Sequence, residues 1–185
     1  MNKNFQLTVT EEEKAYLHGL ARSCIEQKLQ GKNMEFSLPP PGGIARAELG
    51  AFVTLTLNDS LRGCIGRLLG DGPLYKTVAA MACAAAFEDP RFPPVTAEEF
   101  PGIKTEISIM GPISPCPDTQ AIEVGRHGLI ARRGGRQGLL LPQVPVEWGW
   151  DRETFLARTC AKAGLPPDAW KKPDCQIFWF EAVVL

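Results

Sequence analysis

The strongest constraint on the fold is an alternation of apolar and polar residues with a period of two, present in two separate runs of eight residues. In the first run, residues 50–57, Ala51, Val53 and Leu55 point to one face and the residues between them to the other. The second run, residues 103–110, places its three isoleucines on one face in the same way. A period of two is typical of a β-strand with one buried face. Both runs are therefore predicted to be half-buried strands.

Turn signals extend this reading to the rest of the sheet. Residues 58–60, Asn-Asp-Ser, favour a turn, so residues 61–65 are expected to return as the hairpin partner of the first run. Glycines divide the third quarter of the chain into short apolar runs, which is typical of a meander of strands. The further strands expected are residues 122–124, 129–133, 138–141 and 176–185.

Three helices are marked by residues that favour helix starts. Thr10 and Glu13 have the spacing of a capping box, Pro73 suits a first helical turn, and Asp151 is a good N-cap. A second capping box at Thr96 predicts a further short helix. The three longer helices are expected to end near residues 30, 87 and 164.

The order of these elements is helix, hairpin, helix, strand-rich meander, helix, strand. Helices and strands mix without a regular strand–helix–strand repeat, which favours an α+β fold over a doubly wound sheet. The predicted fold class is therefore α+β, with a mixed, largely antiparallel sheet and flanking helices. A length of 185 residues fits a single domain spanning residues 1–185.

Charge and hydropathy exclude several classes of function. The chain has 20 basic and 21 acidic residues, so it offers no broad basic field for a nucleic-acid backbone, and nucleic acid is an unlikely partner. No segment approaches the ~20 consecutive apolar residues that cross a bilayer, which argues against a membrane protein. Residues 1–5 contain no apolar signal segment. The predicted location is the cytoplasm.

Six cysteines are spread along the chain, and no two of them form a Cys-x-x-Cys pair. Zinc ribbons and fingers need clustered ligands, so no metal site is predicted. The chain also lacks a Walker loop and a dinucleotide-binding fingerprint, and no cofactor is predicted. A cytoplasmic chain of this length needs no disulfide, so free thiols are expected. The cysteines are at positions 24, 64, 83, 116, 160 and 175.

The segment Leu61–Arg67, Leu-Arg-Gly-Cys-Ile-Gly-Arg, carries the first candidate residues. Small residues on both sides leave the thiol of Cys64 approachable, and Arg62 is placed to stabilise a thiolate. The amides of Gly63 and Gly66 are candidates for binding an anion. The alternative is that both glycines are bulge or turn residues and Cys64 is an inert strand residue.

This segment and several others, in the same order along the chain, resemble the AMMECR family. The matching blocks are Leu61–Arg67, Asp89–Phe92, Glu106–Ser108, Val124–Leu129, Gly138–Gln143, Trp150–Asp151, Phe155–Leu156 and Cys160–Leu165. Pro145 is a departure, since alanine is more usual there. The resemblance implies a mixed fold with a large and a smaller lobe, and a surface cleft near Leu61–Gly66. It implies no specific reaction. Bacterial and archaeal members are often encoded beside a Memo-like protein and a radical-SAM protein, which makes these two the expected partners.

Other polar residues in the matching blocks complete the predicted site. His127 lies in a Gly-Arg-His-Gly turn, where a side chain is expected to project freely and exchange protons near neutral pH. Glu106 lies on the polar face of its strand, and Arg91 is a candidate partner for such a carboxylate. Gln143 follows Pro142 at a strand end and is a candidate ligand contact. Each residue has a structural alternative. His127 would be a solvated turn residue and Glu106 an exposed strand residue. Arg91 would form a structural ion pair, and Gln143 would cap a loop.

The predicted catalytic group is Cys64, Glu106 and His127, converging in one cleft. The predicted ligand-binding residues are Arg62, Gly63, Gly66, Arg91 and Gln143. Three classes of function stay open: a small-molecule-binding or enzymatic component, a protein-interaction adaptor, and an RNA-associated regulatory protein. Convergent polar residues would favour the first class, an exposed apolar patch the second, and a basic stripe the third. Whether the protein is an enzyme is left undecided.

Overall fold

The computed structural model describes residues 7–40 and 42–185. Residues 1–6, which include the segment without an apolar signal sequence, lie outside the described residues. The chain divides into two compact units. The N-terminal unit contains residues 7–110 and 183–185, and the C-terminal unit contains residues 111–182. No helix in the described part of the chain is long and apolar enough to cross a membrane.

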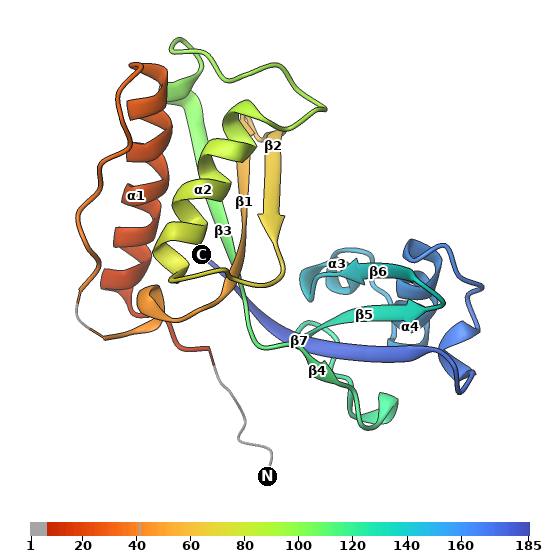
Figure 1. The fold of residues 1–185 in the computed structure, drawn as a ribbon. Coiled ribbons are helices and arrows are strands. Elements are labelled where there is room, and N and C mark those ends of the chain that lie inside the picture. The colour runs from red at the N-terminus through yellow and green to blue at the C-terminus, as the bar shows by residue number, and fades with distance from the viewer. Residues whose placement is uncertain (1–6, 41) are drawn as a thin grey trace. The chain divides into compact units, whose positions relative to one another are not determined.

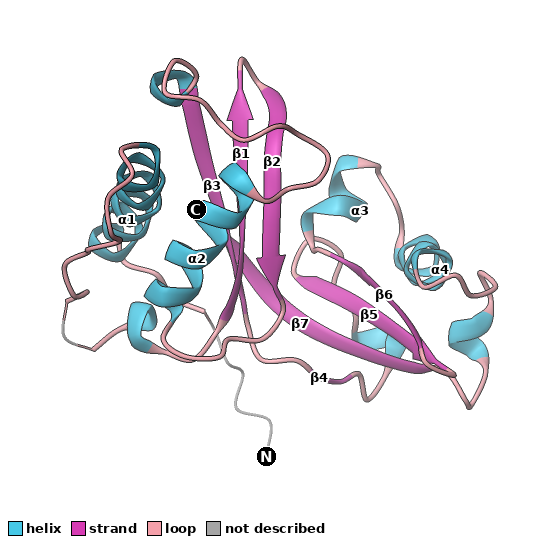
Figure 2. Cartoon of the chain, turned by 45° about the horizontal axis from the view of Figure 1, so that its top comes forward, coloured by secondary structure: helices cyan, strands magenta, loops and turns pink. Residues whose placement is uncertain are grey.

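The N-terminal unit is a three-stranded antiparallel sheet with two helices on one face (Figures 1 and 2). Its central strand pairs with the other two along its whole length. Both helices contact the sheet and each other, so one face of the sheet is covered by helices. The elements are α1 (Glu11–Leu29), β1 (Gly50–Leu57), β2 (Ser60–Arg67), α2 (Leu74–Phe87) and β3 (Ile103–Met110), with 3₁₀ turns at Ile44–Arg46 and Phe100–Gly102.

The predicted local signals operate as expected in this unit. The Thr10 hydroxyl accepts from the Glu13 N–H (3.2 Å), and the Glu13 carboxylate accepts from the Thr10 N–H (3.1 Å), which confirms the capping box of α1. Asn58 and Asp59 both have positive φ, at 51° and 60°, as a tight hairpin turn between twisted strands requires. The sequence therefore specifies the start of α1 and the β1–β2 hairpin locally.

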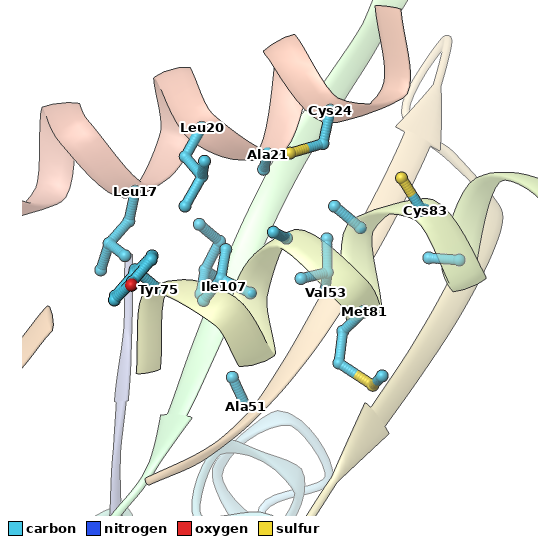
Figure 3. Close-up of a cluster of buried hydrophobic side chains, with 14 of the residues drawn as sticks. Leu17, Leu20, Ala21, Cys24, Ala51, Val53, Tyr75, Met81, Cys83 and Ile107 are labelled. Carbon is cyan, nitrogen blue, oxygen red and sulfur yellow. The ribbon is translucent and has the colours of Figure 1, made fainter. Parts of the chain in front are cut away.

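The core of the N-terminal unit lies between the helices and the sheet (Figure 3). Leu17 of α1 lies against Tyr75 of α2, and Leu20 points toward Ile107 on the buried face of the sheet, to which Val53 also belongs. Burying side chains of this size contributes roughly 1.5–3 kcal/mol each, so this layer is the main source of the unit's stability. The predicted alternation of residues 50–57 is confirmed, because its apolar members are the ones that face this core.

The C-terminal unit is also α+β, with short strands and one long strand. Strand β5 pairs antiparallel with β6 and with β7, and β4 pairs with β7. Helix α4 contacts β5 and β6, and its Phe155 is fully buried. The elements are β4 (Ser114–Pro115), β5 (His127–Arg133), β6 (Arg136–Leu140), α3 (Gln143–Glu147), α4 (Arg152–Lys162) and β7 (Gln176–Val184), with 3₁₀ turns at Thr119–Ala121 and Ala169–Lys171.

The end of the chain returns to the N-terminal unit. Leu185 exchanges two backbone hydrogen bonds with Ile107, at 2.9 and 3.4 Å. Within the N-terminal unit the strand order is β2-β1-β3, and within the C-terminal unit it is β7-β5-β6, with β4 paired to β7. Every paired strand described is antiparallel, and the predicted α+β class with a largely antiparallel sheet is confirmed.

Three local predictions are wrong. Residues 122–124 form no strand, because the chain there leaves a 3₁₀ turn and enters the turn before β5. Residues 97–99 form a turn rather than the predicted short helix, and a 3₁₀ turn containing Pro101 follows it. Gln143, predicted at a strand end, begins the short helix α3.

Candidate functional site

Strand β2, which carries the Leu61–Gly66 segment, lies at one end of the strand order. Cys64 is opposite Thr54 of β1, and Gly63 is opposite Leu55. The register then shifts, since Thr56 is opposite Leu61, and this leaves Arg62 as the extra residue of a β-bulge. A bulge re-aims a side chain locally, so Arg62 is removed from the regular alternation of the strand.

Cys64 and Glu106 lie on the same face of the sheet, on either side of Thr54. Thr54 is the cross-strand partner of both residues. This face is opposite to the one covered by α1 and α2, because Val53 and Leu55 point to the helices. With strands about 4.8 Å apart, the Cα atoms of Cys64 and Glu106 are about 10 Å apart. The structure therefore brings these two predicted residues together on one surface.

The environments of the three side chains in this row differ. Glu106 is exposed, whereas Thr54 and Cys64 are half-buried. The Thr54 hydroxyl donates a hydrogen bond to the Cys64 sulfur, at 3.3 Å. The Cys64 thiol is thus oriented by its neighbour and still partly open to solvent.

The main chain of Cys64 is held by two side chains from the loop after α2. The Cys64 N–H donates to Asp89 Oδ2 (2.8 Å), and Arg91 Nη2 donates to the Cys64 carbonyl (3.2 Å). Arg91 also donates to both carboxylate oxygens of Asp89, at 2.9 and 2.7 Å. Arg91 was a candidate partner for a carboxylate on the strand of Glu106, but the carboxylate that it meets is Asp89.

Asp89 is the most enclosed charged group at this site, with its side chain 2% exposed. The Arg91 guanidinium and then the Cys64 N–H hold the pKa of the Asp89 carboxyl well below its usual range. A carboxylate this enclosed would be costly without such partners. Asp89 therefore stays ionised at neutral pH and fixes the position of Cys64.

Arg62 also forms hydrogen bonds with the loop after α2. Its Nε and Nη2 donate to the two carboxylate oxygens of Glu99, both at 2.9 Å, and Nη2 also donates to the Pro94 carbonyl at 3.2 Å. The hydrogen bond to Glu99 and the ion pair raise the pKa of Arg62 against the effect of burial. Arg62 Nη1 is buried without a partner among the described residues. The arrangement ties the loop to β2, and a ligand-binding role for Arg62 stays a prediction.

The two glycines of β2 are required by close packing rather than by backbone conformation, since neither has positive φ. A Cβ on Gly63 would lie 2.1 Å from the Ala85 carbonyl oxygen of α2. A Cβ on Gly66 would lie 2.2 Å from the Phe52 ring, on the opposite face. Gly63 thus sets the distance between β2 and α2, and Gly66 leaves room for the Phe52 ring.

His127 belongs to the C-terminal unit, and its convergence with Cys64 and Glu106 stays a prediction. The expectation of a freely projecting side chain is wrong, because His127 is the first residue of β5 and only 7% exposed. Its Nδ1 accepts the Glu123 N–H at 2.9 Å, and its ring lies 4.5 Å from that of Trp179. Burial and then the nearby Arg126 lower the pKa of His127.

Gln143, the last predicted ligand contact, is half-buried at the start of α3 in the C-terminal unit. Its Oε1 is buried and has no hydrogen-bond partner among the described residues. A ligand-binding role for Gln143 stays a prediction.

Thr54, Asp89 and Glu99 are the site residues that the sequence analysis missed. In the sequence, Asp89 stands out only as the first residue of the family-matching block Asp89–Phe92, and Thr54 only as a polar member of the alternating strand 50–57. Within residues 7–40 and 42–185, no three His, Cys, Asp or Glu side chains are placed to share a metal ion. All six cysteines are free thiols.

Comparison with known proteins places the chain in a family. The family model AMMECR1 matches residues 18–185. The chain belongs to the AMMECR1 family. It is similar to protein MK0488 of Methanopyrus kandleri, with 47% identity over 186 residues that cover 95% of this chain and 89% of the relative. Protein NEQ441 of Nanoarchaeum equitans is 41% identical over 175 residues, which cover 89% of this chain and 95% of the relative.

A solved structure shares the fold. The crystal structure of the uncharacterized protein PH0010 from Pyrococcus horikoshii matches with a TM-score of 0.80 and 43% sequence identity. The match covers 91% of this chain and 88% of that one. This AMMECR1-family protein therefore shares the fold of a solved structure over nine tenths of its length.

Proposed function

We propose that this AMMECR1-family protein binds a small molecule on the sheet face opposite α1 and α2, with Cys64 and Glu106 in contact with it. The observation that carries this proposal is the cross-strand row of Cys64, Thr54 and Glu106. A thiol, a hydroxyl and a carboxylate side by side on a rigid sheet form a polar contact surface with a defined spacing.

The position of Cys64 supports a site more than an inert strand residue. Its N–H donates a hydrogen bond to Asp89, and its carbonyl accepts one from Arg91. Its sulfur accepts a hydrogen bond from the Thr54 hydroxyl. Such a fixed thiol needs little reorganisation when a ligand arrives, which lowers the cost of binding. Cys64 is half-buried, so the residue is still partly open to solvent.

The spacing limits what Glu106 does. The Cα atoms of Glu106 and Cys64 are about 10 Å apart with Thr54 between them, so the two side chains are placed to reach different parts of a small molecule. Glu106 therefore contacts a second group of the ligand.

Native mass spectrometry of the protein purified from its own cells tests the proposal. We expect a bound small molecule in the parent protein, and its loss in Cys64→Ala and in Glu106→Gln. Cys116→Ala is the matched control, since Cys116 is equally half-buried but lies in the C-terminal unit. Retention of the same molecule in both site variants would contradict the proposal.

A protein-interaction role is the second candidate, favoured by an exposed apolar group in the C-terminal unit. Trp148 is 70% exposed, and Val146 and Val124 are exposed with it. The Trp148 ring stacks on Trp150 at 6.2 Å. Exposed apolar groups of this kind mark interaction surfaces in soluble proteins. Memo-like and radical-SAM proteins remain the proposed partners, and the support for them is the family resemblance alone.

Co-elution with purified Memo-like and radical-SAM proteins of the same organism tests the second candidate. We expect a complex with at least one of them that Trp148→Ser weakens. Separate elution of all three proteins at micromolar concentration would refute it.

An RNA-associated role has less support than either candidate. The three arginines of the local basic cluster already donate hydrogen bonds within the protein: Arg132 to Gln137, Arg133 to Asp174 and Arg136 to the Gly164 carbonyl.

A further inference from the structure

A hollow of about 310 Å³ lies beside α1 in the N-terminal unit, away from the Cys64 row. One wall is a face of α1, and the other is the extended segment 35–37. Gly19 lies in the middle of the helical wall, and a Cβ built there meets no atom within 4 Å. The residues that line the hollow are Ala15, Tyr16, Gly19, Leu20, Ser23, Glu35, Phe36 and Ser37.

The extended wall is fixed by side chains of α1. The Gln27 side chain makes two hydrogen bonds to the main chain of Glu35. Its Oε1 accepts from the Glu35 N–H and its Nε2 donates to the Glu35 carbonyl, both at 2.7 Å. The Tyr16 hydroxyl donates to the Ser37 carbonyl at 2.8 Å. The Phe36 ring packs edge-on against Tyr75, with ring centroids 5.8 Å apart. The hollow is thus preformed, as small-molecule sites usually are.

The lining selects for a positive charge. Two of the lining residues are aromatic, Tyr16 and Phe36, and one is acidic, Glu35. Glu35 is exposed and forms no ion pair with any described residue, and no Lys, Arg or His lines the hollow. Aromatic faces carry partial negative charge and attract ammonium groups, most strongly where water is partly excluded.

We propose that this hollow binds a small organic ammonium ion, with the cation between the two rings and Glu35. The volume is at the lower end of the range for small-molecule sites, which fits a compact cation. Ser23 and Ser37 are also among the lining residues, and a serine hydroxyl suits a polar tail on the ligand. This site is independent of the binding proposed at Cys64, because the two share no residue.

Choline is the probe, and its uncharged carbon analogue 3,3-dimethylbutan-1-ol is the matched ligand control. Both are titrated into ¹⁵N-labelled protein at constant ionic strength, and amide shifts are followed by NMR. We expect saturable shifts at the lining residues with choline and at least roughly fivefold weaker binding of the neutral alcohol. Equal affinity for the two ligands, or no saturable shift with choline, would overturn the proposal.

Two variants locate the site. Glu35→Gln removes the charge without changing size, and we expect it to weaken choline binding roughly fivefold. Gly19→Leu fills the hollow, and we expect it to abolish binding, whereas Gly19→Ala, its control, leaves most of the volume free. Replacing a glycine inside a helix favours folding, so the melting temperature of both Gly19 variants should equal or exceed that of the parent. Undiminished binding by Gly19→Leu would contradict the assignment.

Discussion

Gly63→Ala is the sharpest probe of how β2 is held against α2. A Cβ at this position would lie 2.1 Å from the Ala85 carbonyl oxygen and 3.1 Å from the Ala85 carbonyl carbon. Ordinary carbon–oxygen contacts are about 3.3 Å or longer, so the strand and the helix must separate by about 1 Å. The clashing atoms are main-chain atoms, and no side-chain rotation relieves them.

The expected cost follows from this geometry. Overpacking a close-packed site costs about 1–3 kcal/mol, and a main-chain neighbour places Gly63→Ala at the upper end. We therefore expect the free energy of unfolding to fall by about 3 kcal/mol. Strain from positive φ makes no contribution, because Gly63 has none.

Urea unfolding followed by circular dichroism at 222 nm is the assay, because α1 and α2 contain most of the helical residues. Tryptophan fluorescence would be misleading, since all four tryptophans lie in the C-terminal unit. Gly19→Ala is the control, with open space around its Cβ and an expected gain of about 0.5–1 kcal/mol. A Gly63→Ala protein within about 0.5 kcal/mol of the parent would refute the packing argument.

Three further predictions concern ionisable groups. Asp89 has a lowered pKa, so its contribution to stability is present above about pH 4 and is lost as pH falls toward the folded value. The gap in unfolding free energy between the parent and Asp89→Asn should therefore narrow below about pH 4, and a constant gap would contradict this. Mild alkylation of the native protein, read by peptide mass spectrometry, should modify the half-buried Cys64 and Cys116 first. Cys24 should react among the last, because burial raises its pKa to about 11, and its early modification would refute the buried arrangement. The ring of His127 should titrate below about pH 6.5 in NMR spectra, with Nδ1 unprotonated, since burial lowers its pKa and Nδ1 accepts the Glu123 N–H. A value at or above about 6.5 would contradict a ring whose titration is dominated by burial.

The regular elements of the N-terminal unit were predictable because their signals are local. Strand β1 occupies residues 50–57 and β3 occupies 103–110, as the alternation predicted. Helix α1 begins after Thr10 because the capping box satisfies its free N–H groups. Each signal depends only on residues within the element or next to it.

The failures occur where a distant partner or a short element decides the structure. Thr96 and Glu99 do exchange the hydrogen bonds of a capping box, at 3.0 and 3.3 Å, but no α-helix follows. The Glu99 carboxylate is shared with Arg62, 37 residues away, and Pro101 follows in the 3₁₀ turn. Helix α3 has only five residues, with Pro145 inside it, and such a length gives no periodic pattern.

The candidate site was predictable only in part. Glu106 was assigned to the polar face of its strand and the Cys64 thiol was expected to be approachable, and the register places both residues on the same face of the sheet. The β-bulge that removes Arg62 from the alternation depends on the pairing of β1 with β2, which a single strand does not reveal. His127 was misjudged because its flanking glycines predict a turn, whereas pairing with Glu181 of β7 makes it the first residue of a strand.

Asp89 shows why the remaining part of the site could not be predicted. Strand β2 is at the end of the strand order, so Cys64 would leave an N–H and a carbonyl without strand partners. Asp89 and Arg91 bind these two groups, as a neighbouring strand would, and they bind each other. The Asp-Pro-Arg-Phe segment is thus the missing partner of the Leu-Arg-Gly-Cys-Ile-Gly segment, although 25 residues separate Cys64 from Asp89. Because the two segments satisfy one set of hydrogen bonds, a substitution in either should disturb the position of the Cys64 thiol.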